Sequence, residues 1–259
     1  MLLDDAEPQR AVAECPWDFT ALADTYDFRP DYSADLIRDV LGRLQPLPGD
    51  RAIDVGAGTG KLTAHLCANG FDVIAVEPNP KMRARGRANP DARAARWTAA
   101  RGEALPIPAR TAAIVAFGSS FNVVEPRVAL DECARVLMPR GAWFAVYNHR
   151  DLDDPMQREV EAIIHRHVPD FDYGRRRRSP EADVISHGAF CRFESDARRF
   201  VAQVKSKEWM LAWSSHATLQ RQAGSRLPAV LADIRRAIGD TPVLEIPYAT
   251  RAWSARRHW

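Results

Sequence analysis

A regular alternation of short apolar stretches with amphipathic stretches, running from residue 51 to residue 150, constrains the fold more than any other feature of this sequence. Five stretches have the length and composition of buried strands: RAIDV, FDVIAVE, ARAARWTAA, TAAIVAFG and AWFAVYN. Most of them are separated by stretches with helical spacing of apolar residues, such as KLTAHLCANG and VALDECARVLMPRG. Strands that alternate with helices form a mostly parallel sheet covered on both faces. We therefore predict an α/β fold.

The pattern changes after residue 150. Helical spacing recurs over residues 153–168, 207–219 and 227–238, whereas residues 198–204 and 241–257 have the composition of strands. We expect the last strand to run antiparallel along the edge of the sheet. The prediction is thus a seven-stranded, mostly parallel sheet with an antiparallel C-terminal edge strand.

Four regions follow from these patterns. We predict an N-terminal helical cover over residues 1–50 and a ligand-binding core over residues 51–150. Residues 151–192 are expected to form an insertion or lid. Residues 193–259 are expected to complete the sheet and to add helices that cover the substrate.

Composition excludes several classes of protein. The 259 residues are 46% hydrophobic and 27% charged, which is ordinary for a globular enzyme. The net charge of +2 is too small to indicate a nucleic-acid or membrane partner. The four cysteines have no metal-ligand spacing, so no metal is expected. No stretch has the pattern of a membrane span or a signal peptide, and we expect a cytoplasmic location.

A glycine-rich turn, DVGAGTG, follows the first predicted strand and leads into the first predicted helix. Gly56, Gly58 and Gly60 allow a ligand to approach the backbone closely, and the helix start offers free N–H groups. A dinucleotide-binding turn has a glycine at the sixth position of its motif, where this chain has Lys61. The turn therefore disfavours a nicotinamide dehydrogenase, although a tight strand-to-helix turn without a ligand remains an alternative.

Acidic residues follow the same edge of the predicted sheet. Asp54 precedes the glycines, and Glu77 ends the second strand about 20 residues further on, where acids bind ribose hydroxyls in nucleotide-binding folds. Glu103 lies in the loop after the third strand. Since the carboxyl ends of parallel strands share one edge, these acids and glycines are expected to gather there.

At these residues the chain resembles the class I S-adenosylmethionine-dependent methyltransferases, in the small-molecule branch similar to methyltransferase type 11. IDVGAGTG, VIAVEPNPKM and GEALPIP look like the first motif, the second motif and the adenine-contacting loop of that family. The segments ALDECARVLMPRGAWFAVYNHRD, YDFRPDY and VLEIPYATRAWSARR also resemble that branch. The resemblance implies a Rossmann-like sheet and S-adenosylmethionine as cofactor, with S-adenosylhomocysteine as product.

The resemblance also implies a role for each matching position. The backbone of the glycine turn would pass the methionyl and ribose portion of the cofactor, Asp54 would hold its amino-acid end, and Glu77 would accept from both ribose hydroxyls. The loop at Glu103 would face the adenine, and Gly118 and Ser119 would lie beneath the sulfonium. The full predicted set of cofactor-binding residues is Asp54, Gly56, Ala57, Gly58, Gly60, Glu77, Pro78, Met82, Gly102, Glu103, Ala104, Gly118, Ser119, Tyr26 and Arg29.

The general base is not obvious from the sequence. Many members of the branch carry a histidine in the loop after the fourth strand, where this chain has Asn122. His149, beyond the fifth strand, is the first substitute, and His216 in the lid is the second. Either histidine could instead have no catalytic role, His149 as a surface residue at a strand end and His216 as a residue of the helical lid. The nucleophile could instead arrive already activated.

Two further features have mainly structural interpretations. The run Arg175–Arg178 is expected to be solvated, with an anionic small substrate as a secondary possibility. The aromatic residues Phe193, Trp209 and Trp213 are typical of a core, but in a lid they would suit a flat or apolar substrate.

The leading hypothesis is methyl transfer from S-adenosylmethionine to a small, specialised-metabolite acceptor by in-line displacement. An alternative keeps the cofactor pocket but catalyses a cyclisation or rearrangement without net methylation. A nicotinamide dehydrogenase and a non-catalytic binding module are less well supported. We expect a monomer or homodimer with a small-molecule substrate and no nucleic-acid or membrane partner.

Overall fold

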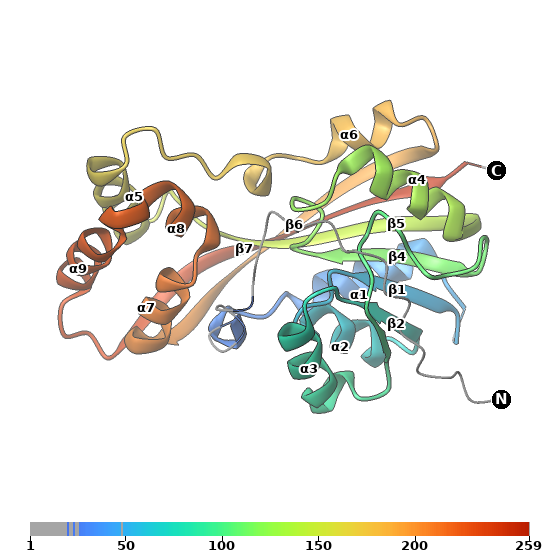
Figure 1. The fold of residues 1–259 in the computed structure, drawn as a ribbon, viewed down its shortest axis with the longest axis horizontal. Helices are drawn as coiled ribbons and strands as arrows, with labels where there is room; N and C mark the ends of the chain where they lie inside the picture. The colour runs from blue at the N-terminus through green and yellow to red at the C-terminus, as the bar shows by residue number, and fades with distance from the viewer. Residues whose placement is uncertain (1–19, 21–22, 24–25, 48, 259) are drawn as a thin grey trace.

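The computed structural model describes residues 20, 23, 26–47 and 49–258. They contain one seven-stranded sheet with the strand order β3-β2-β1-β4-β5-β7-β6 (Figure 1). The strands are β1 (Arg51–Val55), β2 (Asp72–Val76), β3 (Arg96–Thr98), β4 (Ala112–Gly118), β5 (Leu137–Arg150), β6 (Phe190–Lys205) and β7 (Val243–Arg257). The first five are parallel to one another, and the predicted α/β fold with a Rossmann-like sheet is confirmed.

Helices connect these strands largely where the sequence predicts them. The α-helices are α1 (Ala34–Leu44), α2 (Lys61–Ala68), α3 (Pro80–Ala88), α4 (Pro126–Val136), α5 (Pro155–His167), α6 (Glu181–Ser186), α7 (Ser206–Ser214), α8 (Ala217–Ala223) and α9 (Leu227–Ile238). Short 3-10 turns are η2 (Tyr26–Phe28), η3 (Pro90–Ala92), η4 (Gly174–Arg177) and η5 (Gly224–Arg226).

Two apolar clusters hold the helices against the two faces of the sheet. On one face, α1 contributes Ile37 and Val40, which pack with the α2 residue Leu66 and with Phe144 of β5. On the other face, buried residues of α4 pack with the central strands and with Trp143. Burial on both faces explains why β1 and β4 read as continuous apolar runs rather than as alternating ones.

The C-terminal strands differ from the prediction in one respect. β7 is antiparallel, as predicted, but it lies inside the sheet between β5 and β6, so that β6 and not the C-terminal strand forms the edge. β7 pairs with β5 from Ala142 to Arg150 and with β6 along almost its whole length. Its central position satisfies backbone groups on both sides, which an edge strand leaves unpaired.

A second lobe forms where β6 and β7 extend beyond the parallel strands. Residues of α5, α7, α8 and α9 pack there in a third apolar cluster that includes Trp209, Trp213 and Tyr248 (Figure 1). The helix predicted over residues 207–219 is two helices, because the backbone of His216 is extended and its side chain caps α8. Helices from the regions 151–192 and 193–259 thus share one cluster.

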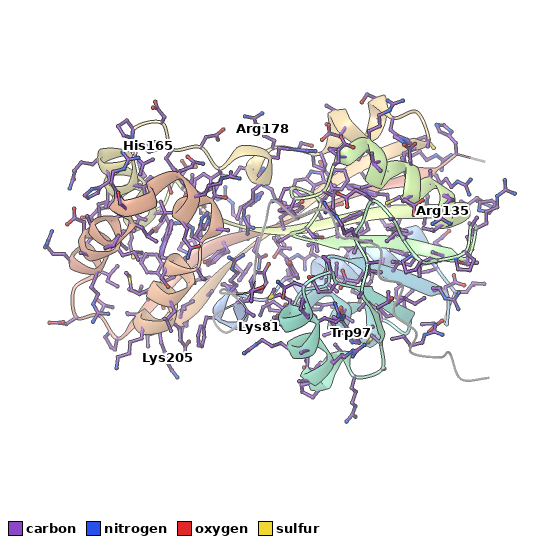
Figure 2. The ribbon with its side chains drawn as sticks, in the orientation of Figure 1. Lys81, Trp97, Arg135, His165, Arg178 and Lys205 are labelled. Carbon is purple, nitrogen blue, oxygen red and sulfur yellow. The ribbon has the colours of Figure 1, made fainter. Side chains whose placement is uncertain are left out.

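The N-terminal cover is described only in part, since residues 1–19, 21–22 and 24–25 lie outside the described residues. η2 and α1 belong to it, and the hydroxyl of Ser33 accepts from the Leu36 amide at the start of α1. Side chains fill the interior of both lobes (Figure 2). No described helix has the length and apolarity needed to cross a membrane.

Candidate active site

The glycine turn after β1 has the shape that the sequence predicts. Gly56, Gly58 and Gly60 have φ angles of 67°, 58° and 85°, which side chains rarely adopt. A Cβ atom on Gly56 would lie 2.6 Å from the Cβ of Ser120, so the turn also requires glycine on steric grounds. The amides of Gly56 and Ala57 donate to the carbonyl of Val76 and fix the turn against the end of β2.

Glu77 lies directly beside this turn. Its Oε2 accepts from the amide of Gly58 at 2.8 Å, and its Oε1 accepts from the amide of Asn79 at 2.8 Å. Burial raises its pKa, while these two hydrogen bonds act in the opposite direction. Each carboxylate oxygen can accept more than one hydrogen bond, so both remain able to accept from a pair of hydroxyls.

Asp54 is fully buried beneath the turn, and half of its carboxylate has no partner. Its Oδ2 accepts from the hydroxyl of Thr63 at 2.6 Å, whereas Oδ1 is buried without a hydrogen bond. Burial raises the pKa of Asp54 to about 7, and the nearby charge of Glu77 acts in the same direction. An unpaired buried oxygen is unfavourable, so this position fits a ligand that brings a cation or a hydrogen-bond donor.

Four more of the predicted cofactor residues lie near the turn or the strand beside it. Ala57 and Met82 are buried beside the turn, and Pro78 follows Glu77. Gly102 packs against Val55. A Cβ atom added to Gly102 would lie 2.9 Å from Cγ1 of Val55.

The loop at Glu103 is held by other parts of the protein. The Glu103 carboxylate accepts from the amide of Glu125 at 2.9 Å and lies 3.5 Å from Nε of Arg101, and Ala104 is exposed beside it. This carboxylate therefore ties the loop after β3 to the start of α4. Its predicted contact with adenine stays a prediction.

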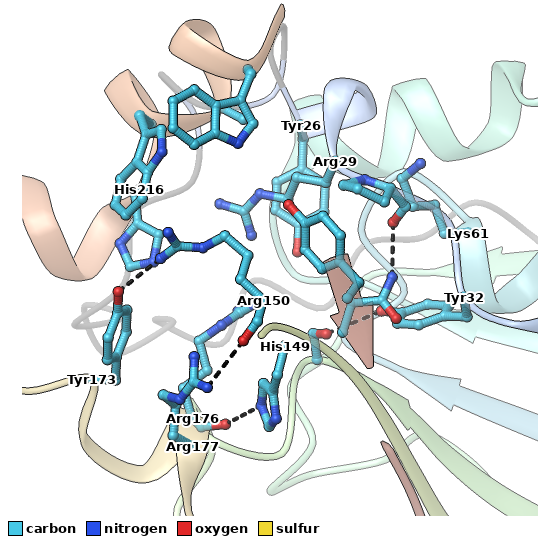
Figure 3. A pocket seen from close by; sticks show the side chains of 17 residues that line it. Tyr26, Arg29, Tyr32, Lys61, His149, Arg150, Tyr173, Arg176, Arg177 and His216 are labelled. Carbon is cyan, nitrogen blue, oxygen red and sulfur yellow. Dashed lines mark hydrogen bonds between the residues drawn. The ribbon is translucent and has the colours of Figure 1, made fainter. Parts of the chain in front are cut away.

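A cavity lies next to the turn, between the carboxyl end of the sheet and the C-terminal helices (Figure 3). Ser119, which follows β4 with a φ of 57°, lies at the junction and accepts from the hydroxyl of Tyr32 at 3.1 Å. Cationic and aromatic side chains dominate the lining. The cavity is lined by Tyr26, Arg29, Pro30, Tyr32, Lys61, Ser119, Asn148, His149, Arg150, Tyr173, Arg176, Arg177, Trp209, Ala212, Trp213, His216 and Tyr248.

Arg150, at the end of β5, is the most firmly held cation of this cavity. Its guanidinium donates to Oε1 of Gln157 and to the hydroxyl of Tyr173, at 2.8 Å and 2.7 Å. It also stacks on Trp213, with its central carbon 4.0 Å from the ring centroid. Because β5 extends beyond the parallel core, this side chain reaches the helical lobe and joins it to the sheet.

The arginine run 175–178 is only partly solvated, which corrects the prediction. Arg175 and Arg178 are exposed and pair with Asp183 and Asp172, whereas Arg176 and Arg177 line the cavity. The 3-10 turn η4 directs Arg176 and Arg177 toward the cavity and leaves Arg175 in solvent, so the run divides between solvent and cavity. Trp209 and Trp213 are buried, as predicted for core residues, and they also line the cavity.

Two of the three predicted catalytic residues lie in this cavity. The ring of His149 donates from Nε2 to the carbonyl of Arg176 at 2.8 Å, which leaves Nδ1 as an acceptor. Burial and the charge of Arg176 lower the pKa of His149 to about 3. The Nδ1 of His216 accepts from the amide of Leu219, and burial keeps its pKa well below the usual value. Both rings are therefore neutral at pH 7.

Asn122 lies outside this cavity. Its backbone N–H donates to the hydroxyl of Tyr147 at 3.0 Å, and its buried side-chain Oδ1 has no hydrogen-bond partner. It lines a separate hollow together with Tyr147, Arg175 and Arg178. The ring centroids of Tyr147 and His149 lie 6.0 Å apart, so the two hollows are neighbours.

Sequence reasoning missed Tyr173 and Tyr248 as cavity residues, as well as the inward half of the arginine run. Tyr248 pairs with Arg150 across β5 and β7, almost a hundred positions away in the chain. No local pattern marks such a residue. The lining residues that the sequence does predict are Tyr26, Arg29, Ser119, His149 and His216.

A glycine turn lined by the carboxylates of Asp54 and Glu77 thus lies at the carboxyl edge of a sheet with the strand order β3-β2-β1-β4-β5-β7-β6. Residues 53–145 match the family model described as a methyltransferase domain. An uncharacterized methyltransferase of Mycobacterium tuberculosis (strain ATCC 25618 / H37Rv) is 38% identical over 139 residues, which cover 53% of this chain and 54% of that protein. The chain thus spans about half the length of this relative.

Two solved structures share the fold. A candidate type II methyltransferase from Anaeromyxobacter dehalogenans superposes with a TM-score of 0.62 and 21% identity, covering 89% of this chain and 97% of that one. Phosphoethanolamine N-methyltransferase 2 of Haemonchus contortus, solved with S-adenosyl-L-methionine, has a TM-score of 0.52 and 12% identity. It covers 92% of this chain and 57% of that protein. The family match ends at residue 145, before most of the arginine-lined cavity.

Proposed function

We propose that this chain transfers the methyl group of S-adenosylmethionine to a small-molecule acceptor. The observation that carries the proposal is the buried carboxylate pair, Asp54 and Glu77, at a glycine turn beside a partly enclosed cavity that Ser119 lines. The cofactor carries a sulfonium and an ammonium group, both cationic, and acids suit it better than they suit a pyrophosphate. The match of residues 53–145 to a methyltransferase domain supports the same reading.

The residues of the turn fit this cofactor one by one. Glu77 would accept from the two ribose hydroxyls with the oxygens that already accept from Gly58 and Asn79. The unpartnered Oδ1 of Asp54 would accept from the ammonium group, directly or through water. Met82 lies next to Gly58, where it would contact the nucleoside. When bound, the cofactor supplies a methyl group that is already a good electrophile.

The protein would act mainly by positioning the acceptor and excluding water. Alignment of two reactants can supply roughly 7–11 kcal/mol of the barrier, whereas a general base typically adds only ~10²–10⁴-fold. His149 can accept a proton at Nδ1, but its pKa of about 3 makes it a weak base. We therefore propose in-line displacement by a nucleophile that needs little activation. We further propose a specialised metabolite as acceptor, because residues beyond the family match shape the cavity.

The second candidate function is a cyclisation or rearrangement that uses the bound sulfonium without net methylation. The weak basicity of His149 and His216 favours it, since neither is suited to deprotonate an acceptor at pH 7. The two candidates differ in one product, because only methyl transfer releases S-adenosylhomocysteine.

The test is a turnover assay with methyl-labelled S-adenosylmethionine and a panel of small acceptors. Mass spectrometry would follow labelled product and S-adenosylhomocysteine together, with Glu77→Ala as the matched variant. Equal amounts of both products from the wild-type chain, and neither from the variant, support methyl transfer. An acceptor that is converted without S-adenosylhomocysteine supports the second candidate, and a chain that does not bind the cofactor in calorimetry contradicts both.

A further inference from the structure

The cavity beside the glycine turn has a one-sided charge. Five cationic side chains line it, Arg29, Lys61, Arg150, Arg176 and Arg177, and its seventeen described lining residues include no aspartate or glutamate. Several like charges around a partly enclosed space repel one another, and burial weakens their solvation. A bound anion would relieve both effects.

Three of the arginines have partners within the protein. Arg150 donates to Gln157 and Tyr173, stacks on Trp213 and lies 3.7 Å from a carboxylate oxygen of Glu161, which is not among the lining residues. Arg29 donates to the carbonyl of Ser215 at 3.3 Å and lies over the ring of Tyr26.

Arg177 is also engaged, since it donates to the carbonyl of Arg150 at 3.2 Å. These contacts hold all three guanidinium groups in place, so they shape the cavity and contribute to its positive potential.

Arg176 is different. Its backbone carbonyl accepts from His149, but its guanidinium has no hydrogen bond and no ion pair with any described residue. Burial lowers its pKa, and the charge of Arg29 adds to this effect. A guanidinium has five N–H donors in a fixed plane, so an arginine in such a place has its full binding capacity available.

The walls around these cations are aromatic. Tyr26, Tyr173, Trp213 and Tyr248 contribute ring surface to this lining. Figure 3 shows Tyr26 and Tyr173 on two sides of the arginines. Aromatic walls favour a flat or apolar ligand body, and a guanidinium matches the geometry of a carboxylate or phosphate.

We infer that the methyl acceptor is an anion, carrying a carboxylate or phosphate on a flat apolar body, and that Arg176 binds this charged group. The inference rests on the proposed function for its link to methyl transfer. The acceptor would then carry a negative charge and the cofactor a positive one, with Ser119 between the two ligands. Arg29 would act with Arg176, because both side chains line the same cavity.

The experiment is a set of calorimetric titrations of the full chain. Phenyl phosphate, benzoate and neutral benzyl alcohol serve as probes, inorganic phosphate and acetate lack the apolar body, and S-adenosylhomocysteine reports the cofactor site. The variants are Arg176→Gln, Arg176→Lys and Arg178→Gln. Arg178 is the matched control, since it belongs to the same run but lies on the surface with a side chain that is 71% exposed (Figure 2).

We expect at least one aromatic anion to bind the wild-type chain ten or more times more tightly than benzyl alcohol and than the corresponding small anion. Arg176→Gln should weaken that binding at least tenfold, and Arg176→Lys should restore part of it. Arg178→Gln should change it less than twofold, and S-adenosylhomocysteine should bind every variant alike. The stronger of phenyl phosphate and benzoate identifies the anion.

Several results would overturn the inference. Equal binding of the anions and benzyl alcohol, or equal loss in Arg176→Gln and Arg178→Gln, would show that Arg176 does not select an anion. A loss of S-adenosylhomocysteine binding in Arg176→Gln would assign this residue to the cofactor's own carboxylate. If no variant or wild-type chain binds S-adenosylhomocysteine while the anion pattern holds, the anion site stands and the proposed function fails.

Discussion

The two halves of the candidate active site differ both in charge and in how the chain builds them. The turn after β1 carries buried acids, Asp54 and Glu77, and its residues lie close together in sequence. The neighbouring cavity carries arginines and aromatic rings from η2, β5, η4, α7 and β7, which are far apart in the chain. We propose that one half binds a cationic nucleoside, the cofactor, and that the other binds the methyl acceptor.

The largest expected effect concerns the acidic half. Glu77→Ala should weaken binding of S-adenosylhomocysteine at least 100-fold in calorimetry, about 3 kcal/mol, because both carboxylate oxygens at the turn are removed. Glu77→Gln, which keeps the shape but not the charge, should fall between the variant and the wild type. Binding of phenyl phosphate should be unchanged in both variants. Unaltered affinity of Glu77→Ala for S-adenosylhomocysteine would reject the ribose assignment.

A second prediction tests the backbone of the same half. Gly56→Ala combines a positive φ with a Cβ placed 2.6 Å from Ser120, and should lower the unfolding free energy by about 2–3 kcal/mol. Gly70→Ala is the matched control, because Gly70 has a φ of 83° but no neighbouring atom within 4 Å. It should cost only about 1 kcal/mol in urea unfolding. Equal losses in the two variants would show that the contact with Ser120 is not a constraint.

A third prediction uses the buried carboxyl of Asp54. Its pKa rises from 3.8 in the unfolded chain to about 7 in the folded one, so between these values the folded state binds more protons. The contribution of Asp54 to the stability of the ligand-free protein should therefore fall as pH rises from about 4 to 7, whereas the lowered pKa of His149 acts in the opposite direction. Asp54→Asn should reduce this loss by an amount on the order of 1–2 kcal/mol in urea unfolding. If the two pH profiles are parallel, Asp54 is ionised in the folded protein.

The smallest expected effect separates two roles for His149. As a weak base it would act on the chemical step, and its loss would lower kcat; as the donor to the Arg176 carbonyl it would position the arginine turn. We expect His149→Ala to raise KM for the acceptor or Kd for the anion by about tenfold, with cofactor affinity unchanged. A fall in kcat alone, with both affinities intact, would favour the catalytic role.

The same contrast explains how much the sequence could predict. Gly56, Gly60 and Glu77 are recognisable because local backbone and strand ends determine their place, and the strands around them were predicted close to their observed bounds. Asp54 was also predictable, since β1 ends beside it.

The arginine-lined cavity depends on non-local pairing. The interior position of β7 follows from its partners β5 and β6, and no pattern within residues 241–257 distinguishes it from an edge strand. Arg176 and Arg178 have the same residue type in one polar run, yet only the path of η4 turns one of them inward. His216 breaks a predicted helix because its ring caps α8, which apolar periodicity does not reveal.

A crystal structure of the full chain with S-adenosylhomocysteine tests the division between the two halves most directly. The ribose hydroxyls are expected within hydrogen-bond distance of the Glu77 carboxylate, the amino group near Oδ1 of Asp54, and the sulfur beside Ser119, facing the arginine-lined cavity. A nucleoside bound among Arg29, Arg150 and Arg176, or a turn at Gly56–Gly60 that stays empty at saturating ligand, would contradict it.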